Sequence, residues 1–458
     1  MDENEKVMKN QEETAQVQET NNATVIKTDA DAKDGQNKCP KCGATDISLN
    51  PKNGKLRCNF CRHEFEPEKL DAMEKDISKL EGEIVGSGAT NIIADTNDMV
   101  TFKCSSCGAE VVVDTAKATQ ARCHWCRNTL SVNQQIPNGA VPDTVLPFSI
   151  PKKEAKEAIE KFVGKRKFFA HPMFRKEFTT DNVMGVYLPY MIVDANTHAN
   201  LKGQGEHETR KKKKKNGDSY DTYYDADLYD VERDFDLTIE GLTVESSKDK
   251  LDTGSKDKTN NIINSIMPFD TENCVKWDAN YIKGYTSEKR DTNVEELKGL
   301  VQEQSKDVAR FAANKTLGFY DRGVRWDSEN LEVKGQQWKS AYVPVWLYSY
   351  QQKKGNKSLL HYVAVNARTK ETMGSVPIHM PKLVLISALV EILGIIAMIF
   401  TKTDDNNWPW LFLLSGIIYF WIMHSRYRNS GARHSHETET KTNMTNLREY
   451  DKFVTKRR

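Results

Sequence analysis

The sequence has almost no net charge, because 66 lysines and arginines face 65 aspartates and glutamates among 458 residues. Bulk electrostatics therefore predicts no particular class of partner. Common catalytic patterns are also absent: there is no Gly-x-x-x-x-Gly-Lys-Ser/Thr phosphate loop, no Gly-x-Ser-x-Gly turn and no His-Glu-x-x-His helix. We expect a binding protein rather than an enzyme.

The N-terminus lacks the features of a signal peptide, because the chain opens with MDENE and no apolar run follows. Residues 1–37 contain no aromatic residue and are rich in Glu, Asn, Gln, Thr and Asp. Such a segment buries too little apolar surface to offset the conformational entropy lost on ordering. We expect residues 1–37 to form a disordered tail in the cytoplasm.

Cysteine is present in a strict pattern: eight of the nine cysteines fall in four Cys-x-x-Cys pairs. Fifteen residues separate the two pairs of each half, and the whole pattern repeats after 65 positions. This spacing predicts two structural Zn ions, each held by four thiolates with no open coordination position. The predicted ligands are Cys39, Cys42, Cys58, Cys61, Cys104, Cys107, Cys123 and Cys126.

Two other interpretations of the cysteines are weaker. A redox Cys-x-x-Cys is expected beside a βαβ pattern, and the sequence shows none there. Disulfides would need an oxidising compartment, to which nothing in the N-terminal sequence directs the chain. Cys274 is the odd cysteine, and we expect a buried or unreactive thiol.

The cysteine pairs define two small zinc ribbons joined by linkers. The first ribbon spans residues 38–63 and the second spans 101–130. Residues 64–100 form an acidic linker, in which apolar spacing predicts a helix over Pro67–Glu83. Residues 131–147 form a second linker with three prolines.

The middle of the chain, residues 148–380, reads as a cytoplasmic α+β domain rich in antiparallel strand. Helices are predicted over 151–163 and 293–317, each followed by strand patterns. A weak internal repeat aligns Tyr187-Leu188-Pro189 with Tyr342-Val343-Pro344, which suggests a duplicated unit. Proline inside a strand predicts edge positions or bulges for these segments.

A run of six cations interrupts this domain in a predicted hairpin loop. The run comprises Arg210, Lys211, Lys212, Lys213, Lys214 and Lys215. One interpretation is a solvated loop whose charge is offset by the aspartates between Asp218 and Asp230. The other is contact with an anionic partner, either lipid headgroups or nucleic acid.

Two apolar runs near the C-terminus predict a transmembrane hairpin over residues 381–424. The runs cover 383–400 and 408–423, and the first would extend about 27 Å as a helix. Flanking cations place both termini in the cytoplasm, with a basic cytoplasmic tail at 425–458. The expected location is the cell membrane, with two spans.

Glu391 lies in the middle of the first apolar run. An ionisable residue at membrane depth indicates function by default. However, neither run contains a second ionisable residue, so a proton relay lacks further members. We expect a protonated Glu391 that hydrogen-bonds across the hairpin or to another protomer.

Paired zinc ribbons, a Pro-Phe element before a helix at 147–163, Tyr-x-Pro strands and a terminal apolar hairpin resemble a family of bacterial membrane proteins described as TFIIB-type zinc ribbon-containing. Relatives are sometimes labelled primosomal protein N′, a helicase. The resemblance covers roughly residues 38–424 and implies no activity that maps onto particular residues. The helicase label finds no support, since the phosphate loop is absent.

These features predict a membrane-anchored zinc-ribbon protein that acts as a protein-binding or scaffold module. Its expected partners are membrane lipid and a cytosolic protein of unknown identity. Nucleic-acid binding through the ribbons is the alternative, supported by Phe60, His63 and Trp125. It is not favoured, because residues 38–132 carry 13 cations and 13 acids. A transport role through Glu391 would require oligomers, and the number of chains per assembly stays open.

Overall fold

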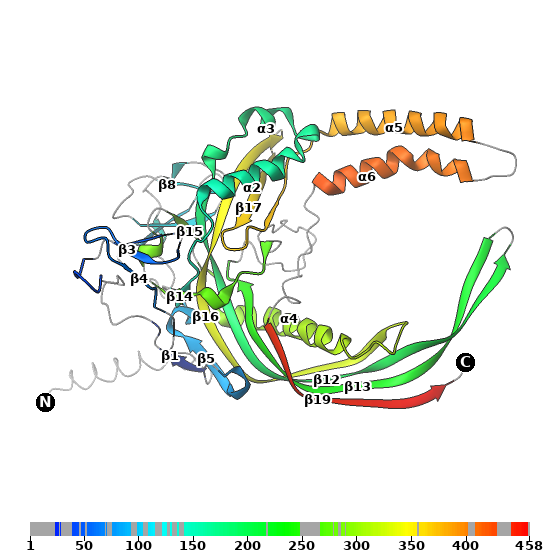
Figure 1. Cartoon of the computed structure of the whole chain (residues 1–458), viewed down its shortest axis with the longest axis horizontal. Coiled ribbons are helices and arrows are strands. Elements are labelled where there is room, and N and C mark those ends of the chain that lie inside the picture. Colours follow the sequence, from blue (N-terminus) through cyan, green and yellow to red (C-terminus); the bar gives the residue numbers. More distant parts are fainter. Residues whose placement is uncertain are drawn as a thin grey trace, which may run out of the picture.

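Two long antiparallel strands run through the molecule in the computed structural model (Figure 1): β12 (Met184–Asn216) and β16 (Val324–Lys354). They pair along β12 as far as Gly205, inside a mixed sheet of 14 strands. The structure describes residues 23–26, 28, 39–44, 47–50, 53–68, 70, 76–92, 99–103, 109–114, 121–125, 129–130, 135–136, 142–216, 219–247, 266–277, 279–282, 285–288, 290–354, 357–401, 408–427 and 441–456.

Each long strand turns back on itself as a hairpin. Strand β13 (Ser219–Glu245) returns beside β12, and β17 (Lys357–Asn366) returns beside β16. Strand β19 (Lys441–Lys456) pairs with β13, so these residues of the predicted basic tail form part of the sheet. Register shifts interrupt the β12–β13 pairing, and such bulges bend strands and increase their twist. The long strands accordingly curve round one side of the molecule (Figure 1).

Shorter elements complete the sheets. The first ribbon forms a three-stranded sheet and the second contributes to the large sheet and to a two-stranded one. The short strands are β1 (Ala23–Ile26), β2 (Ile47–Leu49), β3 (Leu56–Cys58), β4 (Glu64–Phe65), β5 (Gly82–Gly86), β6 (Met99–Lys103), β7 (Glu110–Asp114), β8 (Ala121–Arg122), β9 (Thr129–Leu130), β10 (Gln135–Ile136), β11 (Thr144–Val145), β14 (Val275–Lys276), β15 (Thr286–Glu288) and β18 (Thr372–Gly374).

The two Tyr-x-Pro segments face each other at the centre of the sheet, not at its edge. Tyr187 pairs with Pro344, and Pro189 pairs with Tyr342. The expectation of an edge or a bulge at these prolines is therefore wrong. The physical reason lies on the outer side of each strand, where β15 pairs only as far as Tyr187 and β13 begins at Tyr190. A proline lacks the N–H that such a ladder needs, and Pro189 falls in this gap.

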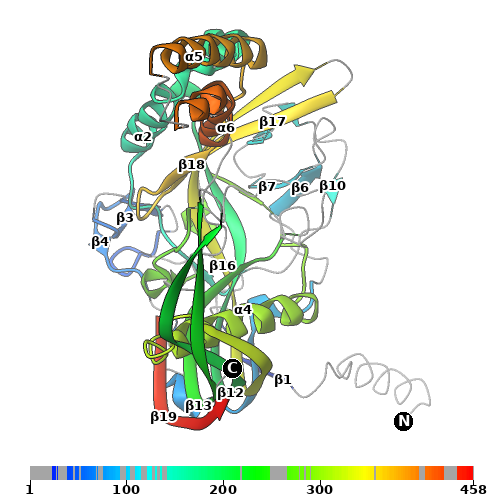
Figure 2. The same cartoon turned by 90° about the vertical axis from the view of Figure 1, so that its right-hand side faces the viewer.

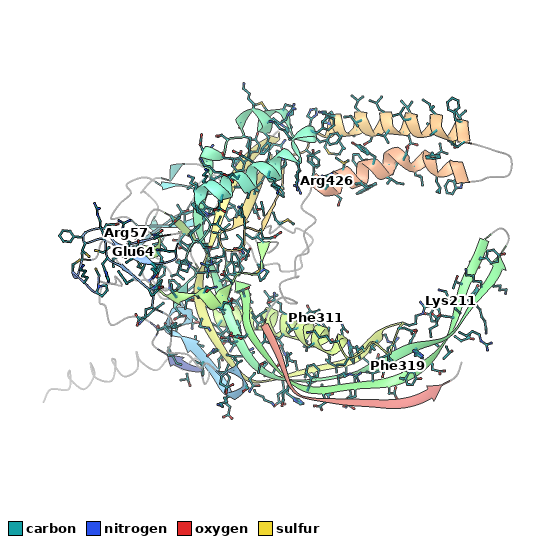
Figure 3. All side chains as sticks on the ribbon, viewed as in Figure 1. Arg57, Glu64, Lys211, Phe311, Phe319 and Arg426 are labelled. Carbon is teal, nitrogen blue, oxygen red and sulfur yellow. The ribbon has the colours of Figure 1, made fainter. Side chains whose placement is uncertain are left out.

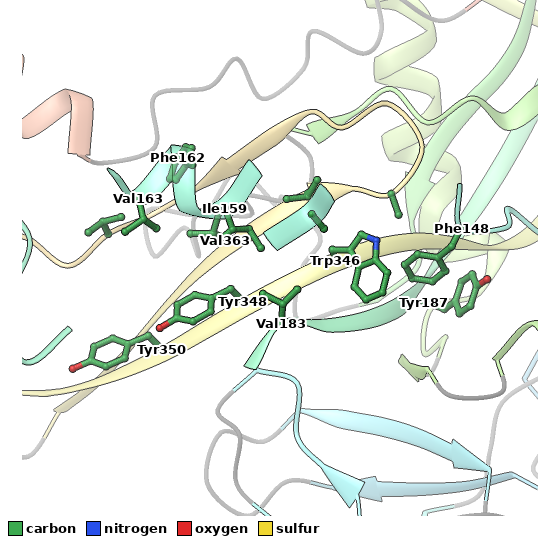
Figure 4. Close-up of a cluster of buried hydrophobic side chains, with 14 of the residues drawn as sticks. Phe148, Ile159, Phe162, Val163, Val183, Tyr187, Trp346, Tyr348, Tyr350 and Val363 are labelled. Carbon is green, nitrogen blue, oxygen red and sulfur yellow. The ribbon is translucent and has the colours of Figure 1, made fainter. Parts of the chain in front are cut away.

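Helices cover the sheet at two places. Helix α2 (Lys152–Gly164) confirms the first predicted helix, and α4 (Val294–Asn314) confirms the second with a shorter C-terminal end. Figure 4 shows the cluster to which α2 contributes Ile159, Phe162 and Val163, together with Tyr187 and Trp346 from the long strands. A separate cluster holds α4 against Phe235, Leu237 and Ile239 of β13. Helix α3 (Pro172–Glu177) follows α2.

The segments expected to be a disordered tail and a helical linker are partly strand. Residues of β1 pair in parallel with β5, which pairs in parallel with β16. The helix expected over Pro67–Glu83 is wrong where the chain is described, since only a 3-10 turn, η1 (Ile77–Lys79), precedes β5. The pairing partners come from distant sequence, which local helical spacing does not register.

A buried carboxylate ties these segments to the sheet. Asp143 accepts hydrogen bonds from the Thr28 hydroxyl, from the Gly88 N–H at 2.7 Å and from the Ser340 N–H at 2.8 Å. Burial raises the pKa of Asp143, while these donors and the charge of Arg290 act in the opposite direction. One side chain thus joins four segments that are remote in the sequence.

The apolar C-terminal segments form a helical hairpin that projects from the body. It contains α5 (Met380–Thr401), the 3-10 segment η8 (Trp408–Leu414) and α6 (Ser415–Tyr427). In the part of the chain that the structure describes, α5 is the one helix long and apolar enough to cross a membrane. Figure 2 shows α5 and α6 at one end of the molecule and β12, β13 and β19 at the other.

The contact between β5 and β16 predicts the effect of a mutation at Gly335. A Cβ there would meet the backbone carbonyl group of Leu80, and backbone does not yield as a flexible side chain does. We expect Gly335→Ala to lower the free energy of unfolding by about 1–3 kcal/mol in denaturant titrations.

The matched control is Gly164→Ala, because nothing lies within 4 Å of a Cβ at Gly164. That variant should stay within about 0.5 kcal/mol of the unchanged protein. Equal effects at the two glycines would contradict the close packing of β5 on β16.

Candidate functional site

Four thiols of the first ribbon lie close enough together to hold a metal ion. The Sγ atoms of Cys39, Cys42, Cys58 and Cys61 all lie within 4.8 Å of one another. Two of the Sγ–Sγ separations are 3.5 Å, between Cys39 and Cys61, and 3.6 Å, between Cys42 and Cys58. Zinc bound to four thiolates at about 2.3 Å needs sulfurs about 3.8 Å apart, so this cluster fits a structural zinc ion.

Two equivalent turns bring the sulfurs together. The Gly43 N–H donates to the Cys39 carbonyl at 2.8 Å, and the Arg62 N–H donates to the Cys58 carbonyl at 2.8 Å. Both residues have positive φ, 70° at Gly43 and 60° at Arg62. Glycine adopts this conformation without a steric cost, whereas arginine does not. The Cys-x-x-Cys spacing signals both turns, but only the first has a glycine that signals the positive φ.

The thiols of this cluster differ in acidity. Burial raises the pKa of Cys39, but the backbone N–H groups of Cys42 and Lys41 stabilise its thiolate, and the pKa falls to about 7. The Ala44 N–H lowers the pKa of Cys42, but burial and hydrogen bonds to the other three thiols outweigh it and raise the pKa to about 12. Zinc binds thiolates, so protons compete with it at each position and its affinity falls as the pH falls.

The second ribbon is integrated into the body. Its strand β7 pairs with β15, and Val111 of β7 is fully buried. Cys123 is buried as well. The other three predicted ligands, Cys104, Cys107 and Cys126, lie outside the described residues, so a second zinc site stays a prediction.

The two residues after Cys123 insert into the large sheet. His124 Nε2 lies 2.5 Å from Glu288 Oε1, and Trp125 donates its indole N–H to the same carboxylate. Ser349 of β16 donates to the His124 carbonyl oxygen at 2.6 Å. The expectation that Trp125 could stack on a nucleotide base is wrong, because its side chain is only 5% exposed and packs edge-on against Tyr362.

The first ribbon presents its metal turns to solvent. Ile47 and Leu56 on its inner side are buried in the main core, and Figure 3 places Arg57 and Glu64 at the side of the molecule opposite α5 and α6. Phe60, between the third and fourth ligands, has a side chain that is 81% exposed. An aromatic residue with this exposure on a rigid turn is a candidate contact for another molecule.

The run of cations from Arg210 to Lys215 forms strand rather than a loop. All six residues lie in β12 and pair with Tyr220 to Asp225 of β13. We name residues 206–216 and 219–228, beyond the end of the β16 pairing, the β arm, and Lys211 marks its outer part in Figure 3. The loop expectation is wrong because the pairing of β12 with β13 continues through the cation run to Asn216 and Ser219.

The pairing divides the charges of the β arm between two faces. Residues directly opposite each other share a face, and faces alternate along a strand. Arg210 and Lys212 therefore lie with Asp225, and Lys212 forms a 2.8 Å ion pair with it. Lys211 and Lys213 share the other face with Tyr224 and Thr222, and this register brings no aspartate opposite them.

Glu391 bonds to the other helix of the hairpin. Its Oε2 accepts the Gly416 N–H at 2.7 Å, near the start of α6, where helical N–H groups have no partner within the helix. Close packing supports the bond, since a Cβ on Gly416 would meet Cβ of Glu391 at 2.7 Å. The carboxyl group thus caps α6 across the hairpin.

Three histidines that are scattered in the sequence gather near the base of α5. The rings of His171 and His379 lie 5.9 Å apart, and His361 is close enough to His171 for their charges to interact. Burial lowers the pKa of His361 to about 4, and His171 acts in the same direction. Only the tertiary fold brings these residues together, and no spacing in the sequence signals it.

Comparison with known proteins adds a relative but no activity. No family model matches the chain, and no solved structure matches it. The chain is similar to the uncharacterized protein YdjG of Bacillus subtilis (strain 168), with 23% identity over 347 residues. The match covers 75% of this chain and 91% of that protein.

Removal of one zinc ligand should affect stability differently in the two ribbons. We expect Cys58→Ser to reduce bound zinc by about one ion per chain, because three thiolates cannot complete a tetrahedral site. The thermal transition of the body should change less than in the comparison variant below, since this ribbon buries only Ile47 and Leu56 in the main core and its three strands form a separate sheet. Metal content and differential scanning calorimetry measure the two effects.

Cys123→Ser is the comparison variant. It should also release about one zinc ion per chain and should lower the transition temperature of the body, because its turn carries His124 and Trp125 into the sheet. Zinc contents that stay equal to that of the unchanged protein would contradict both sites.

The cap on α6 predicts how Glu391 responds to substitution. Glu391→Leu should cost about 1–2 kcal/mol in thermal unfolding of the protein in detergent, because the Gly416 N–H loses its acceptor. Glu391→Gln keeps an acceptor oxygen and should cost less. Equal losses for the two variants would contradict a stabilising role of this hydrogen bond.

Proposed function

We propose that this chain is a membrane-anchored cytoplasmic protein-binding or scaffold module, in which the first zinc ribbon carries the binding surface. The exposure of Phe60 on a metal turn is the observation that supports it most directly. The corresponding turn of the second ribbon is buried against Glu288 and Ser349. The first ribbon is therefore the recruiting element, and the second is part of the support.

The apolar hairpin supplies the anchor. Helix α5 has 22 residues, and its length of about 33 Å suits a hydrocarbon layer of about 30 Å. Its apolar side chains are exposed, including Leu385 at 63% and Leu393 at 65%, as are Trp421 and Ile422 of α6. A helix packed in the core of a soluble protein would bury such residues. In the proposal α5 and α6 form two spans with both chain ends in the cytoplasm, as the cations Lys382 and Arg426 favour.

The β arm limits how the hairpin enters the membrane. Figure 1 shows that the β12–β13 hairpin projects from the same side of the body as α5 and α6. In the part of the chain that the structure describes, no further strand pairs with the outer edges of 210–216 or 219–227, and charged strands with such open edges do not enter hydrocarbon. The proposal therefore requires that the α5–α6 hairpin inclines away from the β arm, which then lies in water near the headgroups.

The domain architecture is consistent with an internal duplication. The units β11–α2–β12–β13 and β15–α4–β16–β17 have the same order of main elements, and the first has helix α3 as an addition between α2 and β12. Each short strand pairs in parallel with the long strand of the other unit: Val145 pairs with Tyr342, and Ser287 pairs with Tyr187. This reciprocal pairing supports a second unit that begins near β15. Membership of the family of TFIIB-type zinc ribbon-containing membrane proteins is part of the same proposal.

Nucleic-acid binding is the second candidate function. Phe60 could stack on a base, and the exposed cations Lys41, Arg57 and Arg62 on the same ribbon could contact phosphates. Fewer residues are available for this function than the sequence suggested, because Trp125 is buried and cannot contact nucleic acid. Salt-dependent binding of RNA or DNA by the full chain would favour it.

The decisive variant is Phe60→Ser, which leaves all four thiols of the first site in place. We expect it to reduce the recovery of zinc-dependent partners about tenfold when tagged protein is captured from nuclease-treated membranes. Tyr220→Ser is the matched control, because Tyr220 is 65% exposed on the β arm. Recovery should stay unchanged in that control and fall with a chelator.

Two outcomes would contradict the scaffold function. Partners recovered equally well by the Phe60→Ser variant would remove the first ribbon as the binding surface. Partners lost on nuclease treatment alone would move the assignment to nucleic acid.

A further inference from the structure

A basic and aromatic surface lies where α5 leaves the body. We name it the collar. It consists of the exposed side chains of Lys165, Lys167, Phe168, Met173, Arg175 and Lys176. From Lys161 to Lys176 the sequence has six cations and no acidic residue. Two apolar side chains stand among these cations, Phe168 at 57% and Met173 at 51% exposure.

Direct contacts attach this segment to both helices of the hairpin. Lys382 of α5 donates to the Phe168 carbonyl oxygen at 2.8 Å and lies 3.8 Å from the centre of the Phe168 ring. The N–H of Phe169 donates to the Tyr427 hydroxyl at the end of α6 at 3.0 Å. Arg166 donates to the Arg426 carbonyl oxygen at 3.2 Å. The collar therefore keeps its place beside the base of the hairpin.

The position of the collar along α5 corresponds to the headgroup layer of a membrane. At the start of α5, Met380 is 38% exposed and Leu383 is buried, and the more strongly exposed apolar side chains begin at Val384 and Leu385, at 53% and 63%. Lys382 precedes them and touches Phe168. Cations and aromatic rings at the boundary between polar and apolar surface match the composition of a membrane interface.

We infer that the collar binds the headgroups of anionic phospholipids around the α5–α6 hairpin. The cations contact the phosphates, and Phe168 and Met173 enter the upper part of the acyl chains. A soluble anion would use the cations but would leave these two apolar side chains in water. The inference rests on the proposed membrane anchor and names its lipid.

The position of the collar is also compatible with the requirement that the β arm stays outside the hydrocarbon. Figure 1 shows α2 and α3 at the end of the body that carries α5, far from the outer part of the β arm that Lys211 marks in Figure 3. A membrane surface that lies over the collar therefore inclines away from the β arm. The polar strands then stay outside the hydrocarbon.

Lipid selectivity tests the collar. Full-length protein in detergent is mixed with equal amounts of phosphatidylglycerol and phosphatidylcholine, and the lipids that stay bound are quantified after gel filtration. We expect phosphatidylglycerol to be enriched, and the double variant Lys165→Gln, Lys167→Gln to lose about fivefold or more of that enrichment. The matched control, Lys152→Gln with Lys153→Gln, removes two exposed cations from the other end of α2 and should keep it.

A second measurement separates the collar from the anchor. Membranes that contain each variant are extracted with alkaline carbonate, and the zinc content of each purified variant reports folding. Retention in the membrane with equal lipid ratios for all variants overturns the collar and leaves the anchor intact. Extraction of the unchanged protein overturns the anchor, and a selective loss at Lys165 and Lys167 would still support the collar as a lipid-binding surface.

Discussion

The antiparallel pairing of β12 with β16 is the contact on which the other parts of the protein depend. It joins the Tyr-x-Pro segments at the centre of the sheet and carries β13 and β17 on its outer sides. The helices α2 and α4 pack on the two ends of this pair and bury separate clusters. Because the pair extends beyond both helices, one end supports the ribbons and the apolar hairpin while the other continues as the β arm. Each projecting part therefore has a defined direction relative to the others.

Buried polar contacts fix the chain segments that have little apolar surface of their own. Asp143 gathers the N-terminal segment and the Gly88 turn onto β16, and Glu288 receives His124 and Trp125 from the second ribbon. A buried carboxylate is costly to leave without donors, so each of these segments is held at one position. The same principle operates in the apolar hairpin, where Glu391 satisfies an N–H group at the start of α6. Three acidic residues thus act as connectors between elements.

The two ribbons, alike in sequence spacing, differ in their surroundings. The second adds strands to the body and buries Trp125, whereas the first exposes Phe60 and the turns around its thiols. In the proposed function, the first ribbon serves recognition while the second serves the fold. The collar beside α5, on the opposite side of the body, is in our proposal the surface that contacts lipid. In this view the protein is a support that holds a recognition surface away from a membrane.

The sequence by itself determined the elements whose signal is local. The spacing of Cys39 to Cys61 predicts a thiol cluster, the apolar period from Lys152 to Gly164 predicts a helix, and the apolar run from Leu383 predicts a long apolar helix. Tertiary structure decided everything that depends on a distant partner. It turned the expected linker helix into β5, placed Arg210 to Lys215 in a strand, buried Trp125 and gave Glu391 the end of α6 to cap. The physical reason is that a strand or a buried polar side chain is stabilised by residues far away in the sequence, and no local pattern records which residues those are.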